Sequence, residues 1–269
     1  MSLDMPGSLS PSKVSTFRDC ALQFRFSVID RLPEMPSMPA AKGTVVHRAL
    51  ELLFGLEPAE RTLGAALPLV EVAADEVLAS DEYVMLELDD PARFRGDARS
   101  LVERYFQLED PTSIHPIGLE LKLEAEVGGV LLRGIIDRLE EAPDGSLIVT
   151  DYKTGRVPGE RYEQGKLGGV HFYAYLCEVA LGRRPSRIQL LYLADPIAIV
   201  AEPSDQSITG LQRRVGAIWS AVERACERDD FRPNPGRLCD WCSFKTCCPA
   251  WGGDPEPARA AALAIAGAR

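Results

Sequence analysis

The 269-residue sequence predicts an α/β fold, in which a central sheet is covered by helices. Capped segments with apolar residues at helical spacing lie in the N-terminal part of the chain and indicate helices. Between residues 118 and 151, apolar and polar residues alternate and turn sequences interrupt the pattern, which is typical of consecutive strands. Helical and strand patterns then alternate up to residue 228, and such alternation favours helices packed on a sheet.

Helices are expected on both sides of a proline-rich, extended crossing at residues 31–43. Ser10 is suited to cap the first helix, with Pro11 in its first turn. The second helix is expected over "GTVVHRALELLFG", residues 43–55. Its apolar face consists of Val46, Leu50, Leu53 and Phe54. Residues 57–112 should form two or three helices, because clusters of Pro and Asp break the helical pattern there.

Three consecutive antiparallel strands are expected in "GLELKLEAEV", "GGVLLRGIIDRLEE" and "LIVTDY". A Gly-Gly turn separates the first two, and the turn sequence "APDGS" separates the last two. A helix at 169–181, a strand in "SRIQLLYLA" and a long helix around 207–228 should follow.

The chain is expected to have three parts. They are a core at 1–235 with an acidic helical insert at about 57–112, a cysteine-rich segment at 236–252, and a tail at 253–269. The tail is rich in alanine, so we expect a loose helix or disorder there.

Composition is ordinary for a globular protein, with 46% hydrophobic and 26% charged residues. No apolar run is long enough to span a membrane, and no secretory signal pattern is present, so we expect a cytoplasmic protein without membrane contact. The net charge of −10 is concentrated in residues 51–126, which hold 18 acidic and 6 basic side chains. The remainder holds 22 acidic and 24 basic side chains, so a nucleic-acid partner is not excluded.

The stretch "VTDYKTG", residues 149–155, places an acid and a lysine at the end of a predicted strand. Asp151 and Lys153 point to the same face, and Asp137 ends the preceding strand. Converging carboxylates repel each other unless a cation lies between them, and oxygen ligands suit Mg²⁺ or Mn²⁺. A nearby lysine can stabilise charge on a phosphate, so the pattern indicates phosphodiester hydrolysis. The alternative is a solvated strand edge, which the apolar run before each aspartate disfavours.

These motifs, "GIIDRL" and "DYKTG" after the helix "GTVVHRALE", together resemble the RecB-like branch of the PD-(D/E)XK nucleases. The resemblance runs from residue 9 to residue 251. It implies a restriction-endonuclease-like core with a mixed central sheet flanked by helices. It also implies a helical insert and a C-terminal iron–sulfur segment.

The resemblance assigns roles to five side chains. It implies metal binding by His47, Asp137 and Asp151, catalysis by Lys153 together with both aspartates, and assistance from Glu120. Glu124 and Glu126 alternate on the same predicted strand, so they stay alternatives to Glu120.

The family usually carries Gln-x-x-x-Tyr on the following helix, where both side chains share one face and position the DNA strand. This chain has "GGVHFYAYL" and no glutamine at that spacing. We expect Tyr173 or Tyr175 to keep the stacking role. His171, four residues before Tyr175, is the candidate polar partner.

Four of the seven cysteines lie within "CDWCSFKTCCPAW", which indicates soft-metal ligation in a reducing compartment. A zinc ribbon would need a second close pair, which the chain lacks. "FRDCALQFRF" resembles the N-terminal cysteine of RecB-like nucleases that hold a 4Fe–4S cluster. By the family's spacing, the implied ligands are Cys20, Cys239, Cys242 and Cys248, with Cys247 as a spare. We expect the cluster to be structural, and zinc in the same thiolates is the alternative.

The expected function is that of a metal-dependent DNA nuclease, specifically a single-strand exonuclease in repair, recombination or defence. No G-x-x-x-x-G-K-S/T loop is present, so a separate helicase would supply strand separation, and single-stranded or frayed DNA is the expected substrate. Candidate phosphate contacts are Arg183, Arg184, Arg187, Arg213 and Arg214. One alternative is a catalytically weak DNA-end-binding or scaffold module. Another is a zinc-stabilised binding protein without a nucleic-acid partner.

Overall fold

The computed structural model describes residues 3–157 and 160–267, with side chains described for 3–157 and 169–262. The chain forms two compact units, each built from separated segments. The first unit comprises Met1–Met35, Ala125–Arg133 and Thr209–Arg269, and the second comprises Pro36–Glu124 and Gly134–Ile208. No helix in the described part of the chain combines the length and apolar character that crossing a bilayer needs.

A five-stranded mixed sheet runs in the order β1-β2-β3-β4-β5. The strands are β1 (Pro116–Val127), β2 (Val130–Glu141), β3 (Leu147–Lys153), β4 (Arg187–Tyr192) and β5 (Ile197–Ala201). β3 pairs antiparallel with β2 and parallel with β4, and β4 pairs antiparallel with β5. The expected α/β fold with a mixed sheet is therefore confirmed. The short edge strand β5 was not expected from the sequence.

Both predicted turns of the first three strands are present. Gly128 and Gly129 adopt φ of 57° and 77° between β1 and β2, a left-handed conformation that suits a two-residue hairpin. Gly145, at φ 83°, occupies the turn between β2 and β3, where the Ala142 N–H donates to the Ser146 carbonyl at 2.8 Å. These turns fix the register that carries the acidic side chains of β2 and β3.

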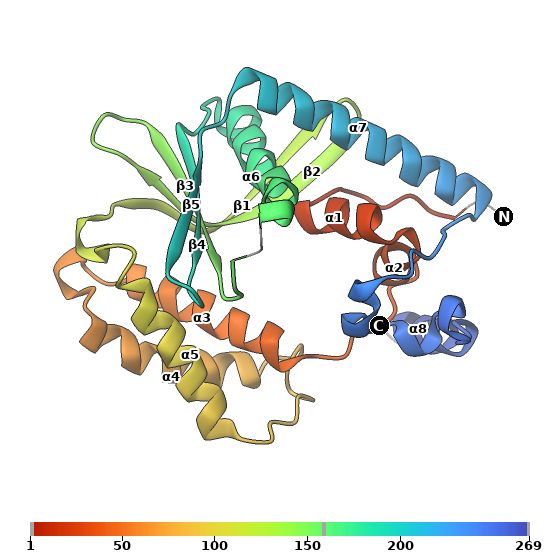
Figure 1. Cartoon of the computed structure of the whole chain (residues 1–269), viewed down its shortest axis with the longest axis horizontal. Coiled ribbons are helices and arrows are strands. Elements are labelled where there is room, and N and C mark those ends of the chain that lie inside the picture. The colour runs from red at the N-terminus through yellow and green to blue at the C-terminus, as the bar shows by residue number, and fades with distance from the viewer. Residues whose placement is uncertain (1–2, 158–159, 268–269) are drawn as a thin grey trace. The chain divides into compact units, whose positions relative to one another are not determined.

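Helices flank the sheet of the second unit. They are α3 (Met38–Phe54), α4 (Leu63–Leu78), α5 (Pro91–Tyr105) and α6 (Glu160–Leu181). Figure 1 shows α3, α4 and α5 together on one side of the sheet and α6 on the other. The expected apolar face of α3 is buried against α4 and α5, and the insert at 57–112 is helical as expected.

The first unit has its own apolar core. Its helices are α1 (Pro11–Asp19), α2 (Ala21–Phe24), a π-turn (Arg25–Ile29), α8 (Glu256–Gly267) and all but the first turn of α7 (Asp205–Arg228). The Ser10 hydroxyl accepts from the Lys13 N–H at 3.2 Å, which confirms the expected N-cap of α1. Three short 3₁₀ turns, Arg237–Trp241, Lys245–Cys247 and Pro249–Trp251, shape the cysteine segment. Phe26 packs edge-to-face on Phe244 at 5.6 Å and joins this segment to the N-terminal helices.

β2 and α6 approach each other closely at Gly134, three residues before Asp137. A Cβ at Gly134 would lie 2.7 Å from Leu176 Cδ1 and 3.1 Å from Tyr173 Cε1. Leu176 is fully buried, so it has little room to move away. The absence of a side chain at Gly134 therefore lets α6 bring Tyr173 toward the sheet.

We expect Gly134→Ala to lower the free energy of unfolding by about 1–3 kcal/mol, because it overpacks the β2–α6 contact. Gly96→Ala is the matched control, since a Cβ there meets nothing within 4 Å and position 96 lies within α5. The control should gain about 0.5–1 kcal/mol through helix propensity. Urea unfolding of both variants measures the two effects, and an unchanged midpoint for Gly134→Ala would contradict the close approach.

Candidate active site

The two aspartates of the acid–lysine pattern lie where β2 and β3 finish pairing. Arg138 and Thr150 form the last pair of the β2–β3 ladder, and Asp137 and Asp151 lie immediately beyond it. The Tyr152 N–H donates to the Asp137 carboxylate, Oδ2, at 2.7 Å. Asp151 is buried, and its Oδ2 forms an ion pair with Lys153 Nζ. The Asp151–Lys153 pair and Asp137 therefore occupy the same end of the sheet.

His47 on α3 faces this end of the sheet. Its Nε2 lies 3.1 Å from the Tyr152 carbonyl oxygen. A carbonyl only accepts hydrogen bonds, so Nε2 carries a hydrogen and Nδ1 is the atom turned to the acids. Nδ1 lies 3.5 Å from Asp137 Oδ2 and 3.9 Å from Glu120 Oε1. A backbone carbonyl that fixes the imidazole in this way is the usual second partner of a metal-binding histidine.

Glu120 reaches the same point from β1 through an unusual backbone. Its φ is +42°, in the left-handed region that non-glycine residues seldom adopt, and such strain clusters at functional sites. Atoms of His47, Glu120 and Asp137 that could bind a metal all lie within 4.8 Å of one another. Glu124 and Glu126, further along β1, are exposed. The structure thus groups Glu120, rather than its neighbours on the strand, with His47 and Asp137.

The electrostatics of the group favour a cation. Burial, followed by the charge of Asp137, raises the pKa of Glu120 to about 7. Burial also raises the pKa of Asp151, although the Lys153 ammonium opposes this shift. Burial lowers the pKa of His47, but the hydrogen bond and charge of Asp137, together with the charges of Asp151 and Glu120, raise the pKa overall. An imidazole and carboxylates at this spacing can hold a divalent metal ion.

Tyr173 is an aromatic side chain of α6 whose pKa is affected by the carboxylates. Burial raises its pKa most, and the charges of Asp151, Asp137 and Glu120 raise it further. His171 and Tyr175 are one helical turn apart and share a side of α6, whereas Tyr173 points away from that side. Tyr175 is buried and His171 is half-buried. The acidic group therefore acts on Tyr173, which lies on the other side of α6 from His171 and Tyr175.

An acidic cleft of about 560 Å³ opens beside His47 and Glu120. Other lining residues are Thr44, Arg48, Glu51, Glu76, Glu82 and Tyr83. Arg48, the basic residue of this lining, is paired with Glu76 at 2.7 Å and Glu51 at 2.8 Å. A phosphate entering this cleft would meet uncompensated carboxylates unless a cation accompanied it.

Two of the candidate phosphate-binding arginines form ion pairs with acidic side chains of the chain itself. Arg183 pairs with Glu141 at 2.6 Å, and Arg184 pairs with Glu178 at 2.5 Å and Asp205 at 2.7 Å. These pairs compete with phosphate for the two guanidinium groups.

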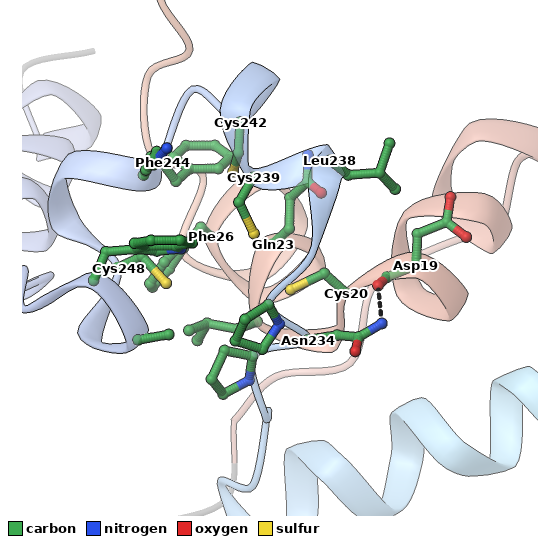
Figure 2. A pocket seen from close by; sticks show the side chains of 16 residues that line it. Asp19, Cys20, Gln23, Phe26, Asn234, Leu238, Cys239, Cys242, Phe244 and Cys248 are labelled. Atoms are coloured by element: carbon green, nitrogen blue, oxygen red, sulfur yellow. Dashed lines mark hydrogen bonds between the residues drawn. The ribbon is translucent and has the colours of Figure 1, made fainter.

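Four cysteines of the first unit face one pocket. Cys20, Cys239, Cys242 and Cys248 line it together with Phe26 and Phe244. Figure 2 shows the sulfur atoms of Cys20, Cys239 and Cys248 turned toward the same space. Burial raises the pKa of the Cys242 thiol most, a backbone hydrogen bond at Phe244 opposes it, and the other three cysteines add to the rise. Four thiolates brought this close repel one another unless a metal centre neutralises them.

Cys247 differs from these four cysteines. It does not line the pocket, and its Sγ donates to the Phe244 carbonyl at 3.3 Å. The Asn234 side-chain amide donates to the Asp19 carbonyl at 2.9 Å, which ties the C-terminal segment to the residue before Cys20 (Figure 2). The four cysteines that the family resemblance implies as ligands thus line one pocket.

Residues 8–249 match the PD-(D/E)XK nuclease superfamily. The chain belongs to this superfamily. Membership of this superfamily implies the chemistry of a metal-dependent nuclease. The acidic group at the end of β2 and β3 is the site that fits this chemistry.

Two phage proteins are related in sequence. "Gene 69 protein" of Mycobacterium phage L5 is 28% identical over 136 residues, covering 49% of this chain and 44% of that protein. "Gene 69 protein" of Mycobacterium phage D29 is 26% identical over 181 residues, covering 58% of this chain and 65% of that protein. The matches span less than two thirds of the length of either relative.

A solved structure shares the fold. The crystal structure of a "Putative exonuclease" from Eubacterium rectale superposes with a TM-score of 0.55 at 12% identity. The match covers 88% of this chain and 87% of that one. At this identity the likeness supports the nuclease fold.

We expect Mn²⁺ to raise the thermal unfolding midpoint of the protein, because the folded state alone assembles His47, Glu120 and Asp137. At about one hundred times Kd the cation should add about 2.7 kcal/mol of stability. Asp137→Asn should lose this effect, whereas Glu124→Gln, a change at an exposed carboxylate on β1, the strand of Glu120, should keep it. Differential scanning calorimetry with and without Mn²⁺ measures the shift. Equal shifts of the unfolding midpoint in both variants would show that the cation binds at another site.

Proposed function

We propose that this nuclease is a RecB-like, single-strand exonuclease that uses Mg²⁺ or Mn²⁺ and acts in DNA repair, recombination or defence. The observation that carries the proposal is the grouping of His47, Glu120 and Asp137 beside the Asp151–Lys153 ion pair. This arrangement combines ligands for a divalent cation with a fixed ammonium, and phosphodiester hydrolysis needs both.

His47, Glu120 and Asp137 would hold the cation, with Asp151 adjoining them. When bound, the cation supplies positive charge that polarises the scissile phosphodiester. The raised pKa of Glu120 means that cation binding must compete with its proton near neutral pH. The hydrogen bond from the Tyr152 N–H orients the Asp137 carboxylate. Cation ligation thus draws on side chains that the fold has already oriented.

Lys153 is proposed to stabilise the negative charge that builds on the phosphate oxygens. Burial lowers its pKa, but the charge and hydrogen bond of Asp151, together with the charge of Asp137, hold the pKa above its usual value. The side chain is therefore a cation at neutral pH, and its ion pair with Asp151 fixes its position. Tyr173, close to the carboxylates, is the residue we assign to stacking against the DNA strand.

Single-stranded or frayed DNA is the proposed substrate. The 269 residues contain no G-x-x-x-x-G-K-S/T phosphate-binding loop, so strand separation would come from a helicase outside these residues. The absent glutamine of the Gln-x-x-x-Tyr pattern supports a second candidate function. In that case the chain would bind DNA ends within a larger assembly and cleave them weakly.

Lys153→Ala should reduce cleavage of end-labelled single-stranded DNA by at least about 100-fold, because it removes the charge that stabilises the transition state. Lys122→Ala, which removes an exposed lysine from β1, should cleave as the wild type does. Both variants are assayed with Mg²⁺, with Mn²⁺ and with EDTA, beside double-stranded DNA.

A ladder of products shortening from one end would support an exonuclease and give its polarity. Full activity in Lys153→Ala would contradict the assigned role. Tight end binding without cleavage by the wild type would favour the second candidate.

We further propose that Cys20, Cys239, Cys242 and Cys248 hold a 4Fe–4S cluster that stabilises the first unit. Four thiolates around a single zinc ion at 2.3 Å would lie about 3.8 Å apart. Within the described residues, no three cysteine sulfurs lie within 4.8 Å of one another, so the pocket suits a larger centre. The centre would join the N-terminal helices to the C-terminal segment, as a staple that closes a long loop.

Cys248→Ser should lose the iron and the visible absorbance of anaerobically purified protein, because it removes a ligand. Cys247→Ser should retain both, since Cys247 lies outside the pocket. Measurement of the iron and zinc content of the two variants distinguishes a 4Fe–4S cluster from a zinc ion. Iron lost from both variants equally would contradict the assignment, and zinc in place of iron would support the alternative metal.

A further inference from the structure

A buried polar row crosses three strands at the level of the active site. Arg138 on β2 pairs with Thr150 on β3, and Thr150 pairs with Gln189 on β4. Arg138 and Thr150 are fully buried, and Gln189 is 7% exposed. Strand alternation places Arg138 and Thr150 on the face opposite to Asp137 and Asp151. A buried guanidinium is costly unless its hydrogen bonds and charge are satisfied.

Glu109, which lies outside the sheet, accepts hydrogen bonds from the polar side chains of this row. It lies in the loop after α5, and both of its oxygens accept from Arg138, at 2.9 Å each. Glu109 Oε1 also accepts from Gln189 Nε2 at 2.6 Å. Thr150 Oγ1 completes the network by accepting from Arg138 at 3.0 Å and from Gln189 at 2.8 Å. One carboxylate thus ties β2 to β4, with Thr150 of β3 between them.

Tyr152 connects this network to the metal-binding side chains. Its hydroxyl accepts from Arg138 Nη1 at 2.9 Å. Its backbone N–H donates to Asp137 at 2.7 Å, and its carbonyl lies 3.1 Å from His47 Nε2. The same residue therefore contacts Arg138 on one side and orients two candidate metal ligands on the other.

We propose that Glu109 is a positioning residue for the metal site, which acts through Arg138 and the backbone of Tyr152 on Asp137 and His47. The inference rests on the proposed function, because it presumes that these two side chains bind the cation. It gives the helical insert, which ends with this loop, a part in building the site. Without the Glu109 charge, Arg138 keeps Glu140 at 3.1 Å as its ion-pair partner and is drawn toward it, away from Tyr152.

A buried ion pair could instead serve only the stability of the unit. The two roles differ in what they change. Loss of a purely structural pair would lower stability and leave the cation affinity of the folded protein unchanged. Loss of a positioning residue lowers cation affinity in protein that remains folded, because outer-shell partners of metal ligands typically contribute about 10- to 100-fold to affinity.

The test measures Mn²⁺ affinity directly, by electron paramagnetic resonance titration of free Mn²⁺, in wild type and Glu109→Gln. Glu109→Gln keeps the size of the side chain and removes its charge, and we expect Mn²⁺ binding to weaken by about 10- to 100-fold. Val70→Ala is the matched control, because Val70 is fully buried in the apolar core of α4. It should be destabilised in urea and bind Mn²⁺ as the wild type does.

A second variant keeps the test decisive if Glu109→Gln folds poorly. Tyr152→Phe removes only the hydroxyl that accepts from Arg138, and we expect a smaller weakening of Mn²⁺ binding. In the double variant the weakening should not exceed that of Glu109→Gln alone, because both changes act on one path. Additive effects, or wild-type affinity in Glu109→Gln, would overturn the proposal. A wild type that binds Mn²⁺ more tightly than Glu109→Gln but cleaves no DNA would overturn the exonuclease and keep this inference.

Discussion

The backbone of Tyr152 is the constraint on which the active site depends. Its N–H holds Asp137 and its carbonyl fixes the ring of His47, so one peptide segment orients candidate metal ligands from β2 and α3. Asp151 and Lys153 are its two neighbours in the chain, and their side chains pair on the other face of the strand. A small shift of β3 would therefore disturb the cation ligands and the lysine together.

Much of the fold could be predicted because its signals are local. The Ser10 cap, the glycine turns and the apolar face of α3 depend on neighbouring residues, and the structure has all of them. The shared face of Asp151 and Lys153 follows from strand alternation alone. β5 could not be foreseen, since its five residues form an exposed edge with little apolar periodicity.

The rest of the site depends on contacts between distant residues. Nothing in the local sequence distinguishes Glu120 from Glu124, because the difference is a positive φ that turns one side chain of β1 toward His47. Glu109 carries no sequence signal of its own, since its partner Arg138 lies 29 residues further along the chain. Cys20 could be joined to the C-terminal cysteines only through the family resemblance, because its own surroundings show one isolated thiol.

The split origin of the cysteine pocket sets the order in which the protein can mature. Cys20 is synthesised long before its three pocket partners, so the pocket cannot close until Cys248 has been made. The segments of the second unit end at Ile208, before any of those three partners is made. The second unit can thus begin to fold on the ribosome before the residues that complete the pocket have been made. Loading of the proposed metal centre would therefore be a later step than folding of the second unit, and a shortage of its metal would leave the first unit incomplete.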